Sequence, residues 1–140
     1  EMSSEANKAV LKQYFDVFFT GDIDELDKLC TDNFVIYNPD VPWADDEGVS
    51  WNGLNIIKND YVAHMRIAYP DGKYTIEDII AEGDKVAVRA TFEGTYVGQP
   101  ASDWKPPDNK RYQWQECSIF RFVDGKVSKA HWYKSEDREI

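Results

Sequence analysis

The stretch "YPDGKYTIEDIIAEGDKVAVRATFEGTYV" (residues 69–97) decides the fold. It opens on the helix breaker Pro70-Asp71-Gly72. Two runs rich in β-branched and aromatic residues follow, 73–81 and 85–97, with the turn Glu82-Gly83-Asp84 between them. Alternating runs on either side of such a turn predict a β-hairpin.

The residues before this hairpin predict helices. Apolar residues recur at helical spacing in 7–20, and Gly21 ends that segment. Asp22 and Glu25 have the spacing of a capping box and open a second, short helix over 22–30. A third helix is expected over 54–69, with His64 on its apolar face.

The residues after the hairpin predict further strands, 110–123 and 126–135, joined by Asp124-Gly125. The segment 98–109 contains three prolines and is expected to be a loop, whereas 33–37 forms an earlier strand. Helices first and antiparallel strands afterwards is the order of an α+β domain. We therefore expect a single domain, 1–140, in which three N-terminal-half helices cover a curved antiparallel sheet and enclose a cone-shaped cavity.

Composition excludes several classes of partner. The net charge of −10 opposes binding to phosphate backbones and anionic lipid surfaces, so we expect no nucleic acid and no membrane partner. The aromatic share of 14% indicates either a thick core or an aromatic-lined cavity. Cys30 and Cys117 lie in apolar sequence contexts, which indicates reduced thiols. No apolar run is long enough to cross a bilayer. We expect a soluble, cytoplasmic protein.

Several short motifs, in order, resemble the SnoaL-like polyketide cyclases of the nuclear transport factor 2-like superfamily, which also contains the ketosteroid isomerases. The residues that carry the resemblance are "TGDIDEL" (20–26), "NFVIYNP" (33–39), the stretch 52–98 with its series "AYPD", "AEGDKVAVR" and "GT", "FRFVDGKV" (120–127) and "HWY" (131–133). The resemblance spans nearly the whole chain. It implies the cone-shaped fold and, as reaction classes, cyclisation, isomerisation or dehydration without a cofactor.

The resemblance also implies which side of each strand faces the cone, and alternation agrees with it. The side chains expected to face inward are Val86, Val88, Ala90, Phe92, Tyr96, Trp114, Glu116, Ser118, Phe120, Ala130 and Trp132. His131 and Tyr133 then point outward, unless a one-residue bulge exchanges them with their neighbours.

Comparison with the isomerases implies roles for three residues. Tyr14 matches their hydrogen-bond-donating tyrosine, Asn38 stands where they carry the catalytic base, and Ser118 stands where they carry a second donor. An amide cannot accept the proton. The cyclases carry histidines where this chain has Tyr37 and Tyr96, and Ala130 stands where an inward acid is expected.

Three titratable residues remain as candidates for proton transfer, the third being His131, which becomes interior only if the register of the last strand slips. Glu116 alternates with Trp114 and Ser118 on an inner face, where lost hydration would raise its pKa towards neutrality. Alternatively it lies at the cavity mouth or pairs with Arg89 or Arg111. His64 is the second candidate, although a histidine on an apolar helix face can also be a hydrogen-bonded core residue.

No motif indicates a cofactor, and the two histidines lack metal-ligand spacing. The run Asp45-Asp46-Glu47 reads as a solvated loop. Trp43, Trp51 and Trp104 lie in expected loops, where they either close a pocket or pack beneath their own loop.

Two hypotheses follow. The first is an enzyme that moves a proton on a hydrophobic, oxygenated, polyketide-like substrate. Its catalytic residues would be Glu116, His64, Tyr14 and Asn38, and its substrate-binding residues Tyr37, Tyr96, Trp114, Ser118, Trp132 and Trp43. The second is a non-catalytic small-molecule binding or dimerisation module of the same fold. In both we expect a homodimer through the outer face of the sheet, where Cys117, Ile119 and Tyr133 would lie.

Overall fold

The computed structural model describes residues 3–140. Its first helix is α1 (Ser4–Phe19), and the N-cap residue is Ser3, whose hydroxyl accepts a hydrogen bond from the Ala6 amide at 3.1 Å. A single 3₁₀ turn, η1 (Ile23–Glu25), leads into the short α2 (Leu26–Leu29). The side chain of Asp22 caps this turn by accepting a hydrogen bond from the Asp24 amide, so the predicted N-cap is confirmed. The predicted return bond from Glu25 does not form, because its carboxylate binds Lys28 instead.

The third helix contains an irregularity that the sequence did not reveal. It runs through α3 (Leu54–Ile56), the π-helical segment η2 (Ile57–Val62) and α4 (Ala63–Ala68). π-Helical turns are rare, and those inside α-helices occur frequently at functional sites. This one carries Asp60 and Tyr61, both of which line a cleft described below.

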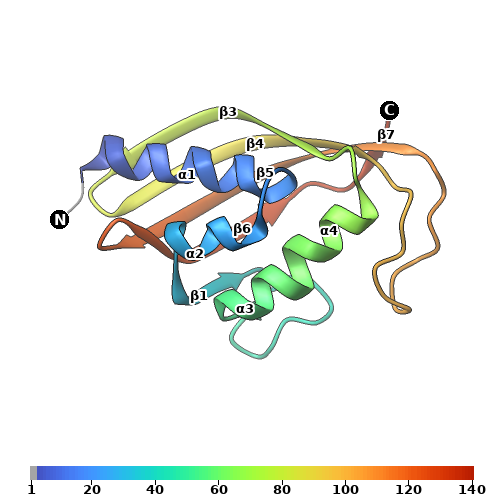
Figure 1. Cartoon of the computed structure of the whole chain (residues 1–140), viewed down its shortest axis with the longest axis horizontal. Coiled ribbons are helices and arrows are strands. Elements are labelled where there is room, and N and C mark those ends of the chain that lie inside the picture. The colour runs from blue at the N-terminus through green and yellow to red at the C-terminus, as the bar shows by residue number, and fades with distance from the viewer. Residues whose placement is uncertain (1–2) are drawn as a thin grey trace.

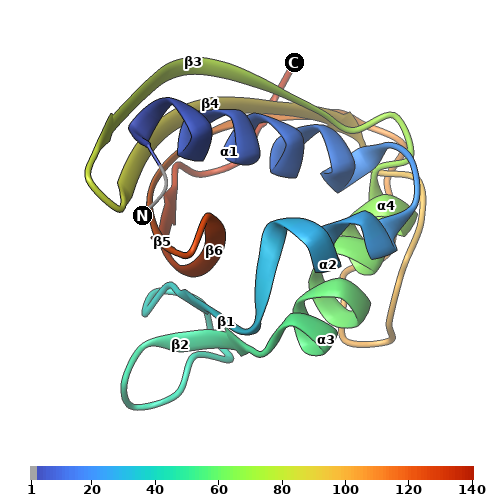
Figure 2. The same ribbon diagram turned by 60° about the vertical axis from the view of Figure 1, so that its left-hand side comes forward.

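Seven strands form one curved sheet: β1 (Cys30–Tyr37), β2 (Val49–Asn52), β3 (Lys73–Glu82), β4 (Lys85–Thr95), β5 (Arg111–Val123), β6 (Lys126–Lys134) and β7 (Arg138–Glu139). The order across the sheet is β2-β1-β6-β5-β4-β3, and β7 pairs with β5. Figure 1 shows α1 lying along the sheet, and Figure 2 shows the sheet curling around it. The predicted α+β cone with three helices is confirmed.

Three details of the sheet differ from the sequence-based expectation. β1 and β6 pair in parallel, so the sheet is mixed rather than wholly antiparallel. β2 lies in a segment expected to be loop, and the two-residue β7 was not foreseen. Short edge strands of this kind carry too few residues to show a period of two.

Alternation along the long strands is as predicted. The inward set from Val86 to Phe92 and from Trp114 to Phe120 is buried, as are Ala130 and Trp132. On the opposite face Ile119 is 45% exposed and Tyr133 48% exposed. His131 also lies outside the core, stacked on Tyr37, so no bulge exchanges it with Trp132.

Two basic side chains tie the third helix to the first two. Arg66 donates to the carbonyl oxygens of Phe18 and Gly21, each at 2.9 Å, at the end of α1. Lys58 is buried and pairs with Asp24 at 2.7 Å and Asp27 at 2.9 Å. These bonds join α4 to the end of α1, and η2 to η1 and α2.

In residues 3–140 no helix is long and apolar enough to span a membrane.

Candidate functional site

Two spaces lie within the cone, one behind the other. The inner one is a cavity of about 20 Å³, which is room for a single water molecule. The outer one is an open cleft of about 880 Å³, within the range of small-molecule sites. Tyr61 and Trp132 line both spaces and therefore form the wall between them.

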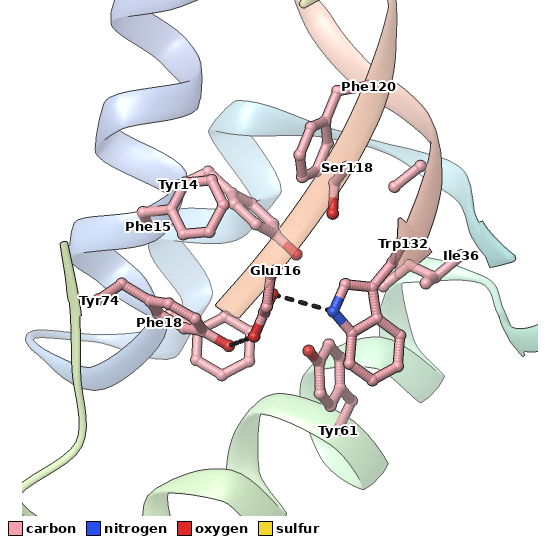
Figure 3. Close-up of a pocket in the computed structure, with 11 residues that line it drawn as sticks. Tyr14, Phe15, Phe18, Ile36, Tyr61, Tyr74, Glu116, Ser118, Phe120 and Trp132 are labelled. Atoms are coloured by element: carbon pink, nitrogen blue, oxygen red, sulfur yellow. Dashed lines mark hydrogen bonds between the residues drawn. The ribbon is translucent and has the colours of Figure 1, made fainter. Parts of the chain in front are cut away.

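Among residues 3–140, Glu116 is the one carboxylate that lines the inner cavity, and it is 5% exposed. Three donors hold it. The indole nitrogen of Trp132 lies 2.9 Å from Oε1, and the Trp114 indole nitrogen and the Tyr74 hydroxyl lie 2.9 and 2.8 Å from Oε2. Figure 3 shows the carboxylate between Tyr74 and Trp132. Since an indole N–H can only donate, this arrangement suits an ionised carboxylate.

Burial acts against that ionised form. Loss of hydration is the largest influence and raises the pKa of Glu116, while the three hydrogen bonds and the charge of Lys134 lower it in part. Neither arginine considered from the sequence pairs with it: Arg89 binds Asp78 at 2.7 Å, and Arg111 binds Glu93 at 2.9 Å. Glu116 is therefore a buried carboxyl group whose pKa is raised, held by neutral donors.

Neutral hydroxyl groups surround the rest of the cavity. Burial, reinforced by the negative charge of Glu116, raises the pKa of Tyr14, Tyr61 and Tyr74 well above the ordinary value. Their hydroxyls and that of Ser118 point towards Glu116 in Figure 3. At neutral pH all three phenols remain protonated, so the cavity offers hydrogen-bond donors beside a single proton acceptor.

The outer cleft is aromatic. Trp114, Trp132 and the loop residue Trp43 line it together with Trp51 and Trp104, which are all five tryptophans of the chain. Trp51 stacks on Tyr61 with ring centroids 4.1 Å apart and an interplanar angle of 12°. The loop tryptophans are therefore part of the cleft wall, whereas the sequence had left open whether they pack beneath their own loops.

His64 lines the outer cleft and not the inner cavity. It is half-buried, and its ring makes an edge contact with Trp104 at a centroid distance of 6.3 Å. His64 and Glu116 thus face different spaces, on either side of the wall formed by Tyr61 and Trp132.

Three predicted site residues line neither space. Asn38 is buried, but its Oδ1 accepts a hydrogen bond from the Asp40 amide at 3.0 Å, an Asx turn that starts the loop after β1. Tyr37 stacks on His131 at 4.8 Å on the outer side of the sheet. The Tyr96 hydroxyl donates to the Lys105 carbonyl and fastens the loop after β4.

Sequence reasoning left many of the lining residues out of the predicted site, and four of them bear on the argument below. Tyr61 was seen as part of an apolar helix stripe, and Tyr74 was expected only as a strand residue. Trp51 was taken for a loop residue because β2 was not recognised. Asp60 precedes Tyr61 on the same helix, and an i, i+4 spacing to His64 was the only available signal. In residues 3–140 no three His, Cys, Asp or Glu side chains gather closely enough to hold a metal ion.

Comparison with known proteins agrees with this architecture. A SnoaL-like polyketide cyclase from Agrobacterium tumefaciens superposes with a TM-score of 0.73 at 19% identity, over 96% of this chain and 94% of that one. IdmH from Streptomyces antibioticus, a candidate polyketide cyclase, gives 0.72 at 21% identity, over 92% and 91%. AclR from Streptomyces galilaeus, a candidate hydroxylase, gives 0.72 at 22% identity, over 95% and 81%.

At these identities the likeness concerns the fold, and the names of the three proteins already cover two kinds of activity. No curated protein matches the chain. The sequence model of the SnoaL-like domain matches residues 11–130, which is most of the chain and includes Tyr14, His64 and Glu116. The resemblance predicted from sequence is thereby confirmed, and the chain belongs to the SnoaL-like domain family.

Proposed function

We propose that the protein is a cofactor-independent cyclase, isomerase or dehydratase that acts on a small, hydrophobic, oxygenated substrate of polyketide type. One observation carries this proposal: a buried carboxyl group with a raised pKa stands beside neutral phenols, directly behind the wall of a ligand-sized aromatic cleft. A carboxyl group in such surroundings is suited to general acid/base chemistry near neutral pH.

In the proposed mechanism the rings of the substrate lie against the tryptophans of the cleft. The reacting edge of the substrate enters the water-sized space beside Glu116. The carboxylate takes a proton from the carbon next to a carbonyl group, and the electrons of that C–H bond move onto the carbonyl oxygen. The hydroxyls of Tyr14 and Tyr61 donate to the enolate oxygen that forms, in place of the predicted Tyr14 and Asn38.

The next step depends on the substrate. The Glu116 proton returns to a different carbon in an isomerisation. In a cyclisation the enolate carbon attacks a second carbonyl group, and the proton neutralises the resulting alkoxide. His64 stands on the cleft side of the wall and is proposed to exchange protons with the distal part of the substrate.

Hydrogen–deuterium exchange tests the first step without knowledge of the natural substrate. 2-Tetralone, a bicyclic ketone with acidic α-hydrogens, is incubated with the protein in D₂O, and deuterium uptake is followed by mass spectrometry. We expect the wild type to accelerate uptake. Glu116→Gln should lower the protein-dependent rate by about 100-fold or more, because general-base catalysis contributes roughly 10²–10⁴-fold.

The matched control is Glu82→Gln, which makes the same substitution at an exposed position at the end of β3. His64→Gln has its own control in His131→Gln, outside both spaces. Exchange that survives both Glu116→Gln and His64→Gln at the wild-type rate would remove both residues from the proposed mechanism.

A second function, ligand binding without chemistry, is favoured by the small volume of the inner cavity. Glu116 already accepts three hydrogen bonds, and the space beside it has room for only one water molecule. This alternative predicts that a small molecule extracted from the purified protein is released unchanged after prolonged incubation. Protein-dependent conversion of that molecule would exclude it.

We also propose a homodimer through the outer face of the sheet. Ile119 and Tyr133 are about half exposed there, and Cys117 lies between them on the same face. An apolar strip of this kind is a usual feature of subunit interfaces. Sedimentation equilibrium at micromolar concentration should give the mass of two chains, and Ile119→Asp should give the mass of one. A wild-type mass of one chain would contradict the dimer.

A further inference from the structure

The aromatic rings at the base of the open cleft form a corner of several faces. Trp51 stands at its centre, with its ring centroid 5.3 Å from that of Trp43, 4.1 Å from Tyr61 and 5.9 Å from Trp132. Tyr61 and Trp132 are 5.8 Å apart. Faces of aromatic rings carry partial negative charge and attract cations. A group of such rings around one space is the arrangement by which proteins hold alkylated ammonium groups.

The charged residues of the cleft are mainly acidic. Asp60, Asp103 and Asp137 line it, against the single lysine Lys134. Three carboxylates and one ammonium group give a net charge of two negative units. Lys134 is already paired with Asp137 at 2.8 Å. Within the part of the chain that the structure describes, Asp60 and Asp103 have no basic side chain within salt-bridge distance, so their charges are available to a ligand.

The protein itself places an ammonium group on one of the cleft tryptophans. Lys134 Nζ lies over the Trp114 ring, 4.6 Å from the ring centroid, and also donates to Ser135 O at 2.9 Å. The same ammonium group is held by Asp137, so a carboxylate of the cleft and a tryptophan face bind one cation together. A tryptophan face of this cleft therefore accepts a cation. The indole N–H of the same residue, Trp114, donates a hydrogen bond to Glu116.

From these contacts we propose that the cleft binds an organic cation: a hydrophobic ligand that carries a protonated or quaternary amine. The ammonium group lies against the corner formed by Trp43, Trp51, Tyr61 and Trp132, and Asp60 and Asp103 attract it from the rim. The inference rests on the proposed function only in taking the cleft as the substrate site. Anionic ligands are disfavoured, because the cleft and the whole chain are both negatively charged.

A pair of isosteric probes isolates the effect of charge. Phenyltrimethylammonium and tert-butylbenzene have nearly the same shape, and only the first is charged. Because all five tryptophans line the cleft, their fluorescence reports on its occupancy. We expect phenyltrimethylammonium to bind at least about fivefold more tightly, the factor that a cation–π contact of ordinary strength supplies. Equal or tighter binding of tert-butylbenzene would overturn the proposal.

Substitution of the rim acids provides a second test. Asp60→Asn combined with Asp103→Asn should weaken phenyltrimethylammonium binding by about two- to tenfold, since exposed charge pairs contribute modestly. The affinity for tert-butylbenzene should not change. The control combines Asp16→Asn with Asp32→Asn, two exposed positions outside the cleft that give the same change in net charge. Equal weakening in the two double variants would overturn the assignment of Asp60 and Asp103.

The outcome is separate from that of the exchange experiment, because 2-tetralone is neutral and phenyltrimethylammonium has no α-carbonyl hydrogen. Loss of charge discrimination with exchange intact would refute the cation site alone. Charge discrimination without exchange would support the cation site while contradicting proton transfer.

Discussion

The inner cavity and the outer cleft share a wall, yet they are built for opposite tasks. The inner cavity has room for a single water molecule, and the carboxylate that lines it accepts three hydrogen bonds. The outer cleft is more than forty times larger and is bordered by exposed carboxylates and the half-exposed ring of Trp43. Residues of the first space should therefore govern stability and protonation, and residues of the second should govern binding.

The wall between the two spaces should show the largest effect on stability. Trp132→Ala removes a buried indole ring and a donor to Glu116, and it merges the cavity with the cleft. Large-to-small substitution of a buried aromatic residue costs about 3–5 kcal/mol of unfolding free energy. Urea denaturation measures this loss. Trp104→Ala is the control, because Trp104 lines only the cleft; an equal loss in both variants would erase the distinction between the two spaces.

Stability as a function of pH tests the inner cavity by itself. Burial raises the pKa of Glu116 in the folded state above its ordinary value of 4.5, so the folded protein binds the proton more tightly than the unfolded chain. Between the unfolded and folded pKa values the contribution of this group to the unfolding free energy therefore falls as the pH rises. The slope is at most about 1.4 kcal/mol per pH unit for one proton.

Comparison with Glu116→Gln separates the contribution of Glu116 to the unfolding free energy from the contributions of carboxylates whose pKa is lowered, such as Asp71 and Glu93. The difference in unfolding free energy, wild type minus variant, should decrease as the pH rises above about 4.5 and become constant once the folded group has ionised. A difference that increases over this range would mean that the hydrogen bonds from Trp114, Trp132 and Tyr74 outweigh burial.

The contrast between the two spaces also explains how far the sequence could predict the site. Alternation in long strands placed Trp114, Glu116 and Trp132 correctly on the inner face. Over eight or more residues the assignment of alternate side chains to one face is unambiguous, because every second residue repeats it. It could not show that the indole groups of the two tryptophans point at the same carboxylate. That contact requires β5 and β6 to lie side by side with Ser118 opposite Trp132, a register that only the folded sheet defines.

The errors lie where chain direction changes. Asn38 and Tyr37 were assigned to the site because they end a strand that leads into it, but the Asx turn at Asn38 directs its amide into the loop. Tyr96 was placed inside by the alternation of β4 and is indeed buried, yet its hydroxyl is used by the loop that follows. Loop residues such as Trp104 and Asp103 have no period, so the sequence left two alternatives open for Trp104 and gave no indication for Asp103.

Trp43 should show the smallest effect on stability and sharpens the contrast from the side of the cleft. Its side chain is 56% exposed, so Trp43→Ala should change the unfolding free energy by less than about 0.5 kcal/mol, as is usual for surface positions. The ring nevertheless stands at the edge of the aromatic corner, 5.3 Å from Trp51. Truncation should therefore weaken phenyltrimethylammonium binding severalfold while deuterium exchange into 2-tetralone keeps its dependence on Glu116. Calorimetric titration measures the affinity for phenyltrimethylammonium. An affinity that Trp43→Ala leaves unchanged would confine the cation site to Trp51, Tyr61 and Trp132.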